Sequence, residues 1–168
     1  TPVISSAASD VYKRQTPFNA FMFIQGLETL ALRVREHSKN ADEIAKFLMD
    51  HPKVERVVHP SVASDLAKER ADKYLSGGCG GLMGFEIKGG IEAGKQFINS
   101  LEMFYHVANI GDSRSLAIHP ASTTHSQLNE EELLSAGVTP GYVRLSIGLE
   151  HLDDIKDDLS QALDKVSV

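Results

Sequence analysis

The longest regular pattern of apolar residues runs from Phe18 to Asp50 and has the spacing of a helix. Mostly apolar side chains recur there every three or four residues, which places them on one face; these residues are Leu30, Val34, His37, Ala41, Ile44 and Leu48. The pattern predicts a single helix of roughly 30 residues, about 45 Å long. Its first part, residues 18–27, is apolar nearly all round, as in segments that are buried on every side. A chain this small offers little surface to bury it.

Shorter strand-like and helical patterns alternate along the rest of the chain. Apolar runs bounded by Gly or Pro predict strand candidates at 54–58, 81–87, 103–109 and 115–120. Helical spacing predicts helices at 64–75, at 91–101, just after residue 129, and from 152 to 163. Ser64 or Asp65 is a suitable N-cap for the first of these helices. Asn129 with Glu132 three residues later predicts a capping box at the third.

The run "GYVRLSIGLE" (141–150) predicts one more strand, with an arginine on its polar face. Side chains alternate between the two faces of a strand. One face, which should meet a core, carries Val143, Leu145 and Ile147. The other face carries the polar residues Tyr142, Arg144 and Ser146.

These elements together predict an α+β fold, in which helices cover a short, mostly antiparallel sheet of about four strands, with mixed pairing left open. We expect one domain over residues 16–168. Residues 1–15 are rich in Ser, Ala and Thr, follow no sustained apolar period, and lack the apolar core of a secretory signal. We therefore expect them to form a flexible leader.

Composition and charge narrow the classes of partner. The formal net charge of the 168 residues is −6, and no cluster of Lys and Arg stands out, which argues against nucleic acid as a partner. No apolar stretch approaches the length of about 18 residues that spans a membrane. The chain has one cysteine, Cys79, so no internal disulfide can form, and we expect a cytoplasmic setting.

Most motifs that carry chemistry do not occur. The glycine-rich stretch 77–90 fits neither GxGxxG nor GxxxxGK[ST], and strand-end turns explain it better than a phosphate loop does. Cys79 has no CxxC partner, the seven histidines show no metal-ligand spacing, and no GxSxG-type elbow accompanies a catalytic serine. We therefore predict no metal site.

Two regions remain as candidates for a binding site. The stretch 108–128 gathers Asn, Asp, Ser, Arg, His and Thr around two strand-like pieces, although a polar surface loop would have the same composition. Arg144 could be an ordinary surface arginine on a half-buried strand. An arginine on the polar face of a sheet can also bind a carboxylate through two parallel hydrogen bonds.

Three long motifs give the chain a family resemblance. The segments "PFNAFMFIQGLETLALRVREHSKNADEIAKFL", "VANIGDSRSLAIHPASTTHSQL" and "GVTPGYVRLSIGLEHLDDIKDDLSQAL" resemble the C-terminal part of the Cys/Met-metabolism family of pyridoxal-phosphate (PLP) enzymes. The resemblance covers about residues 16–166. The motif "HPASTTHSQL", with "NIGD" ahead of it, is more similar to the O-acetylhomoserine sulfhydrylase branch than to the cystathionine branch.

The resemblance implies a fold, a reaction and a set of site residues. It implies the small C-terminal domain of an aspartate-aminotransferase-like fold. The implied reaction joins O-acetylhomoserine and a sulfide or thiol into homocysteine or methionine, with release of acetate, and the cofactor carries the chemistry. Arg144 corresponds to the arginine that holds the substrate α-carboxylate. Asn109 corresponds to a position at the substrate end of the cofactor, and Ser115 and Thr124 match positions near that pocket.

The resemblance also implies parts that this chain lacks. In the family the N-terminal domain carries the Schiff-base lysine, the aspartate that faces the pyridine nitrogen, the stacking tyrosine and the phosphate-binding loop. Lys88 in "IKGG" is the nearest superficial match to that lysine, but it lies in the wrong part of the alignment. We therefore expect no catalytic residue, no bound PLP and no activity in this chain by itself. The complete enzyme is expected to be a homo-oligomer, a tetramer, acting on an amino-acid substrate.

Two alternative functions stay open at this stage. Within the family, the chain could be part of a cystathionine γ-synthase or γ-lyase. Outside catalysis, it could be a stand-alone interaction or ligand-binding module that kept the fold and lost the chemistry.

Overall fold

The structure is a computed structural model that describes residues 16–167, in two compact units divided at Val34 and Arg35. The predicted leader lies outside the described residues. The helices are α2 (Pro17–Glu28), α3 (Leu30–Met49), α4 (Asp65–Tyr74), α5 (Gly90–Ser100), α6 (Glu130–Ser135) and α7 (Leu152–Lys165). The strands are β1 (Val54–Val58), β2 (Leu82–Ile87), β3 (Tyr105–His106), β4 (Leu116–Ile118) and β5 (Tyr142–Ser146), and two short 3₁₀ helices span Pro60–Val62 and Pro120–Ser122.

The single helix predicted over residues 18–50 is wrong, because the helix is interrupted at Thr29. α2 ends at Glu28 and α3 begins at Leu30, with Thr29 at φ −106° and ψ 4° between them. The Arg33 guanidinium donates to the Thr29 hydroxyl at 2.8 Å and to the Gly26 carbonyl at 2.9 Å. These bonds satisfy polar groups at the helix end, and Gly and Thr are both weak helix formers. The apolar period continues across Thr29, so the sequence pattern did not indicate the break.

The apolar side chains of α2 are exposed within the first unit. Their exposed fractions run from 55% at Met22 and Ile24 to 70% at Phe18, and no residue of this helix is buried. The Thr16 hydroxyl caps the helix by accepting the Asn19 amide at 3.2 Å. The described residues of the first unit therefore leave these side chains uncovered.

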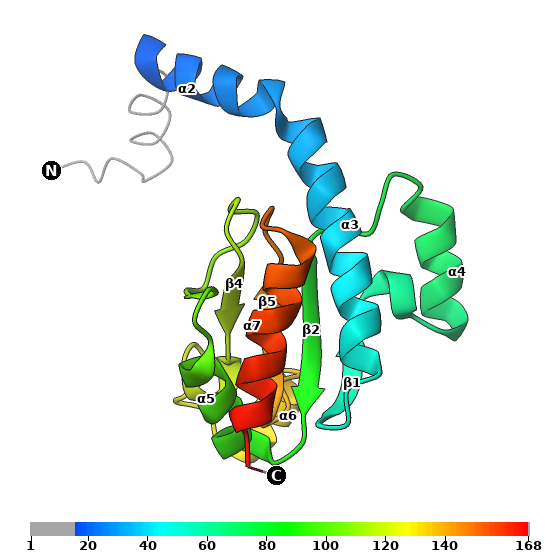
Figure 1. Cartoon of the computed structure of the whole chain (residues 1–168), viewed down its shortest axis with the longest axis vertical. Coiled ribbons are helices and arrows are strands. Elements are labelled where there is room, and N and C mark those ends of the chain that lie inside the picture. Colours follow the sequence, from blue (N-terminus) through cyan, green and yellow to red (C-terminus); the bar gives the residue numbers. More distant parts are fainter. Residues whose placement is uncertain (1–15, 168) are drawn as a thin grey trace, which may run out of the picture. The chain divides into compact units, whose positions relative to one another are not determined.

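A five-stranded mixed sheet forms the centre of the second unit. The strand order is β1-β2-β5-β4-β3, and neighbouring strands are antiparallel except for the parallel pair β3 and β4. The labels in Figure 1 follow part of this order, from β1 through β2 and β5 to β4. The sheet has five strands, where about four were expected. β3 lies inside the predicted run 103–109 but has two residues, so that strand is much shorter than predicted. The other predicted elements are confirmed with small shifts at their ends, including the capping box of α6.

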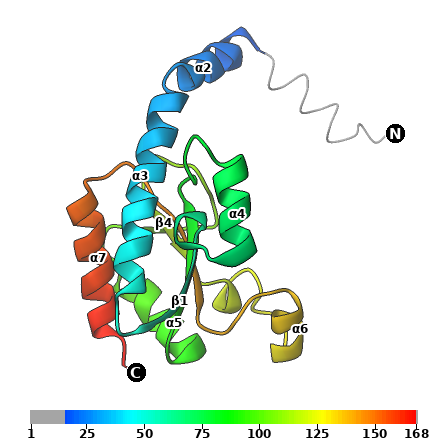
Figure 2. The same cartoon turned by 90° about the vertical axis from the view of Figure 1, so that its right-hand side faces the viewer.

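The core lies between one face of this sheet and three helices. α3, α5 and α7 cover that face, while α4 and α6 lie on the opposite side (Figure 2). Val143, Leu145 and Ile147 are fully buried, which confirms the face assignment made from the alternation. Phe85 of β2 meets Phe97 of α5 edge to face, with ring centroids 5.3 Å apart. Within residues 16–167 no helix is long and apolar enough to cross a membrane.

Candidate functional site

The polar face of β5 lies in the middle of the sheet. Arg144 is paired with Gly84 of β2 on one side and with Ile118 of β4 on the other. A Cβ added at Gly84 would lie 2.6 Å from a ring carbon of Tyr142, so the tyrosine ring packs against bare backbone there. Burial raises the pKa of the Tyr142 phenol, which keeps it protonated at neutral pH. Glycine at position 84 therefore makes room for an aromatic wall beside Arg144.

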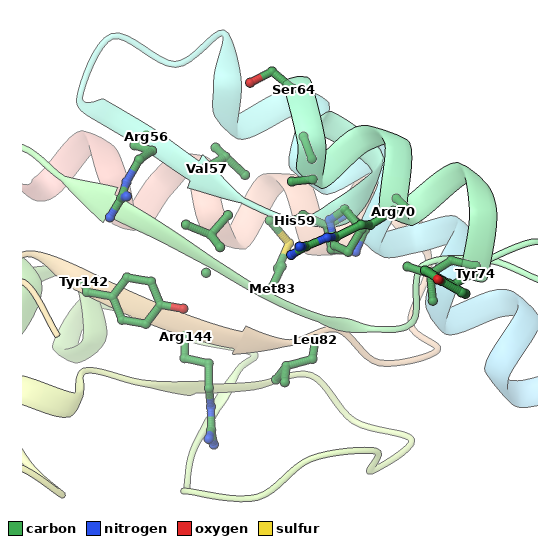
Figure 3. A pocket seen from close by; sticks show the side chains of 17 residues that line it. Arg56, Val57, His59, Ser64, Arg70, Tyr74, Leu82, Met83, Tyr142 and Arg144 are labelled. Atoms are coloured by element: carbon green, nitrogen blue, oxygen red, sulfur yellow. The ribbon is translucent and has the colours of Figure 1, made fainter. Parts of the chain in front are cut away.

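A groove of about 770 Å³ runs between this face and α4 (Figure 3). Its lining includes apolar side chains such as Val58, Leu82 and Met83. It also includes three arginines, Arg56, Arg70 and Arg144, and no Asp, Glu or Lys among the described residues. The lining is thus positively charged in a chain whose net charge is −6. Such a groove suits a small anion that also carries an apolar part.

Arg144 lies at one side of the groove, and no carboxylate of the described residues pairs with it. Its side chain points away from α4 in Figure 3. Nη2 donates to the Asn109 carbonyl at 3.3 Å, and among the described residues no ion pair involves Arg144. Arg56, in contrast, lies 3.9 Å from the Glu86 carboxylate. Because a guanidinium carries five N–H donors, Arg144 keeps donors for a further acceptor.

Three contacts hold the loop between β3 and β4 against β5 and the turn that follows it. The Gly111 amide donates to the Ser146 hydroxyl at 3.1 Å. The Leu149 amide donates to the Ser113 carbonyl at 2.8 Å. The Ser115 amide donates to the Glu150 carboxylate at 2.6 Å. The loop that carries Asn109 is therefore fixed to the strand that carries Arg144.

Ser115 is fully buried, and its hydroxyl bonds within the protein. It donates to the second Glu150 carboxylate oxygen at 2.9 Å and accepts the Gly148 amide at 2.9 Å. A Cβ at Gly148 would lie 2.6 Å from the Arg114 carbonyl carbon. The glycine thus allows the turn to approach the loop. These contacts give Ser115 a structural role, and its expected contact with substrate stays a prediction.

Thr124 lies apart from the groove, on the surface beyond the second 3₁₀ helix. Its hydroxyl shares a 2.9 Å hydrogen bond with His125 Nδ1. The histidine that precedes it in "HPASTT", His119, is fully buried between the Ser122 hydroxyl and the Pro140 carbonyl, each 2.8 Å away. Burial lowers the pKa of His119 and keeps the ring neutral. The structure therefore puts Arg144 in contact with the Asn109 carbonyl, while the Ser115 and Thr124 hydroxyls bond elsewhere and neither residue lines the groove.

Sequence reasoning missed Ser146, Gly148 and Glu150 as parts of the site. All three belong to "RLSIGLE", directly after Arg144, so the motif itself was the available signal. Their partners lie 33 to 35 residues away in the chain, so their roles depend on tertiary contacts.

Comparison with known proteins identifies the family. The profile of the Cys/Met metabolism PLP-dependent enzyme family matches residues 6–164. The chain belongs to this family. The match begins at residue 6, inside the segment that the sequence analysis set apart as a leader.

The chain is similar to several curated members of the Cys/Met-metabolism family. It is 55% identical to the O-acetyl-L-homoserine sulfhydrylase of Leptospira meyeri over 90% of this chain and 34% of the relative. It is 48% identical to O-acetyl-L-homoserine sulfhydrylase 1 of Thermus thermophilus, over 88% of this chain and 35% of the relative. An L-methionine gamma-lyase of Fusobacterium nucleatum is 43% identical over 89% of this chain and 38% of the relative. The chain spans about a third of the length of these relatives.

A solved structure supports the fold. A candidate O-acetylhomoserine (thiol)-lyase from Campylobacter jejuni matches with a TM-score of 0.84 and 45% identity, over 96% of this chain and 38% of that one. That protein contains an N'-pyridoxyl-lysine-5'-monophosphate. The predicted α+β fold of a PLP-dependent enzyme is thus confirmed.

The groove does not by itself form a site for PLP. Its lining contains neither a lysine to bond the cofactor nor a carboxylate to face its ring nitrogen. Lys88 lies elsewhere, with its amine donating to the Pro52 carbonyl at 2.6 Å. The described lining of the groove therefore offers arginines that could bind an anion, and no side chain of the kinds that attach PLP.

Proposed function

We propose that this chain is the C-terminal, substrate-carboxylate-binding part of a PLP-dependent O-acetylhomoserine sulfhydrylase. The proposed reaction joins O-acetylhomoserine and a sulfide or thiol into homocysteine or methionine, with release of acetate. The similarity to two sulfhydrylases supports this reaction. The observation that carries the site assignment is the guanidinium of Arg144, a half-buried residue; it bonds to the Asn109 carbonyl and, within the described residues, to no carboxylate.

The geometry around Arg144 suits an α-carboxylate. A planar guanidinium binds a carboxylate through two parallel hydrogen bonds, and partial burial strengthens the attraction by lowering the local dielectric constant. Asn109 stands beside the guanidinium, where it would border the bound substrate. Ser115 supports the base of the same loop, and the expected place of Thr124 near the substrate stays a prediction, because this residue lies apart from the groove.

The complete enzyme supplies the rest of the site. We infer that an N-terminal domain absent from this chain provides the lysine that binds PLP, and that the enzyme is a cytoplasmic homo-oligomer, a tetramer. This chain by itself should neither bind PLP covalently nor turn over O-acetylhomoserine. A PLP adduct that borohydride traps on one specific lysine of this chain would contradict this expectation.

A γ-elimination of methionine is the second candidate, because an L-methionine gamma-lyase of Fusobacterium nucleatum is 43% identical to this chain. A carboxylate-binding arginine serves both reactions, so the groove does not separate them. The cystathionine enzymes and a non-catalytic module remain further alternatives. An upstream reading frame that encodes a lysine-bearing domain would favour an enzyme over the stand-alone module.

The assignment of Arg144 is tested by two substitutions in the full-length protein. Arg144→Ala should raise KM for the amino-acid substrate steeply, because loss of a charged bidentate contact from a desolvated pocket costs about 2–5 kcal/mol. Arg144→Lys should also be impaired, because an ammonium lacks the planar pair of donors. PLP content should stay normal in both variants.

Arg70→Ala is the matched control, because Arg70 lines the same groove from α4. It should change KM far less than Arg144→Ala does. Wild-type KM and kcat in both Arg144 variants would refute the carboxylate role.

A further inference from the structure

We propose that Ser146 is a positioning residue for substrate binding, and this inference rests on the function proposed above. Its hydroxyl holds the Gly111 amide, fixes the Asn109 carbonyl, and thereby sets the direction of the Arg144 guanidinium. Ser146 follows Arg144 by two residues on the same face of β5, and it is 4% exposed.

The direction of Arg144 depends on the loop. Within the described residues, the Arg144 side chain donates a hydrogen bond from Nη2 to the Asn109 carbonyl, 3.3 Å away. An arginine side chain has many rotamers, and a fixed acceptor selects among them before a ligand arrives. The position of that carbonyl therefore determines where the remaining N–H donors point.

The two ends of the loop are held by different contacts. The far end, at Ser113 and Ser115, is fixed by the Leu149 amide and the Glu150 carboxylate. For the near end, residues 109–111, the hydrogen bonds to β5 within the described chain come from Arg144 and Ser146. Loss of the Ser146 hydroxyl should thus release the near end and leave the far end in place.

Gly111 adapts the loop to this contact. Its φ of +74° lies in the left-handed region, which glycine adopts without steric cost. A Cβ there would meet no atom within 4 Å, so the glycine serves the backbone conformation rather than close packing. That conformation accompanies the 3.1 Å bond from the Gly111 amide to Ser146.

The test measures loop protection and kinetics together in the full-length protein with PLP bound. Ser146→Ala should accelerate hydrogen exchange of the Gly111 amide and leave the Ser115 amide protected. KM for the amino-acid substrate should rise about 3- to 10-fold, the range expected for one neutral hydrogen bond, with a smaller change in kcat. PLP content should not change. Ser146→Thr keeps the hydroxyl. In each of the two variants, KM should rise only if exchange of the Gly111 amide becomes faster.

Ser135→Ala is the matched control, because it also removes one serine hydrogen bond, to the Glu132 carbonyl in α6. Ser135→Ala should change neither the hydrogen exchange of the Gly111 amide nor KM. Unchanged KM in Ser146→Ala would overturn the proposal, whether or not Gly111 exchanges faster. So would a raised KM in Ser146→Thr with Gly111 still protected, or a loss of PLP in Ser146→Ala. If Arg144→Ala raises KM and Ser146→Ala does not, this inference fails and the proposed function stands.

Discussion

Single residues shape this site mainly by making room for others. The Tyr142 ring lies where a Cβ of residue 84 would be, and the turn after β5 approaches the backbone of Arg114 where a Cβ of residue 148 would be. In both places a glycine lets a polar group or a ring take a position set by β5. The strand that carries Arg144 therefore also organises its surroundings.

Gly148→Ala should destabilise this chain. The added methyl group would meet the backbone of Arg114 and Ser115, which cannot rotate away as a side chain can. Overpacking of this kind typically costs about 1–3 kcal/mol in the free energy of unfolding. Gly77→Ala is the control, because a Cβ there meets nothing within 4 Å. Equal urea midpoints for the two variants would show that the turn can shift.

At the scale of elements, α7 fixes the segment that leads into β3. Asp158 is 7% exposed, and its carboxylate accepts the backbone amides of Glu102, Met103 and Phe104 at 2.8, 3.0 and 3.2 Å. Gln161 adds a side-chain donor at 2.9 Å. One carboxylate thus satisfies three consecutive backbone donors in a segment without regular structure.

Asp158→Ala should lower the free energy of unfolding by about 3 kcal/mol or more, because it leaves buried amides without an acceptor. Asp158→Asn retains one carbonyl oxygen and should fall between the alanine variant and the wild type. Asp157→Ala, at the exposed neighbouring position, serves as control and should be nearly neutral. If Asp158→Ala resembles this control in a denaturant titration, water replaces the carboxylate at little cost.

Sequence patterns predicted some elements well and others poorly, for physical reasons. The alternation in β5 identified its buried face because one face of the sheet is covered by helices. Asn129 and Glu132 identified the start of α6 because a capping box is a local interaction. The break at Thr29 escaped prediction because the apolar period continues across it, and the strand predicted at 103–109 proved too long, because β3 has two residues. The burial of Ser115 depends on Glu150, 35 residues away, which no local pattern contains.

For the whole molecule, the exposed α2 predicts the behaviour of the isolated chain. Its six large apolar side chains are more than half exposed, and each forgoes about 1.5–3 kcal/mol of burial. The helix should therefore fray or self-associate, while residues 35–167 stay folded around their own core. Hydrogen exchange measures the fraying of α2, and sizing chromatography measures the self-association of the chain.

Fast exchange over residues 18–27 in a monomer, or slow exchange in an oligomer, is expected for the isolated chain. Replacing Phe21 and Ile24 together with Ser should weaken any self-association, and Gln25→Ser should not. Slow exchange over this segment in a strictly monomeric chain would contradict the prediction.

The central claim is that Arg144 binds the carboxylate of an amino-acid substrate, and a comparison of two ligands on the wild type and one variant tests it most directly. The dissociation constants of the amino acid and of the matching amine without its carboxylate are measured for the full-length wild type and for Arg144→Ala. We expect Arg144→Ala to weaken binding of the amino acid at least about 30-fold, corresponding to the lower end of 2–5 kcal/mol. Binding of the amine should change less than about twofold, within the scatter of a neutral surface substitution. An equal loss for both ligands, or no loss for either, would contradict the claim.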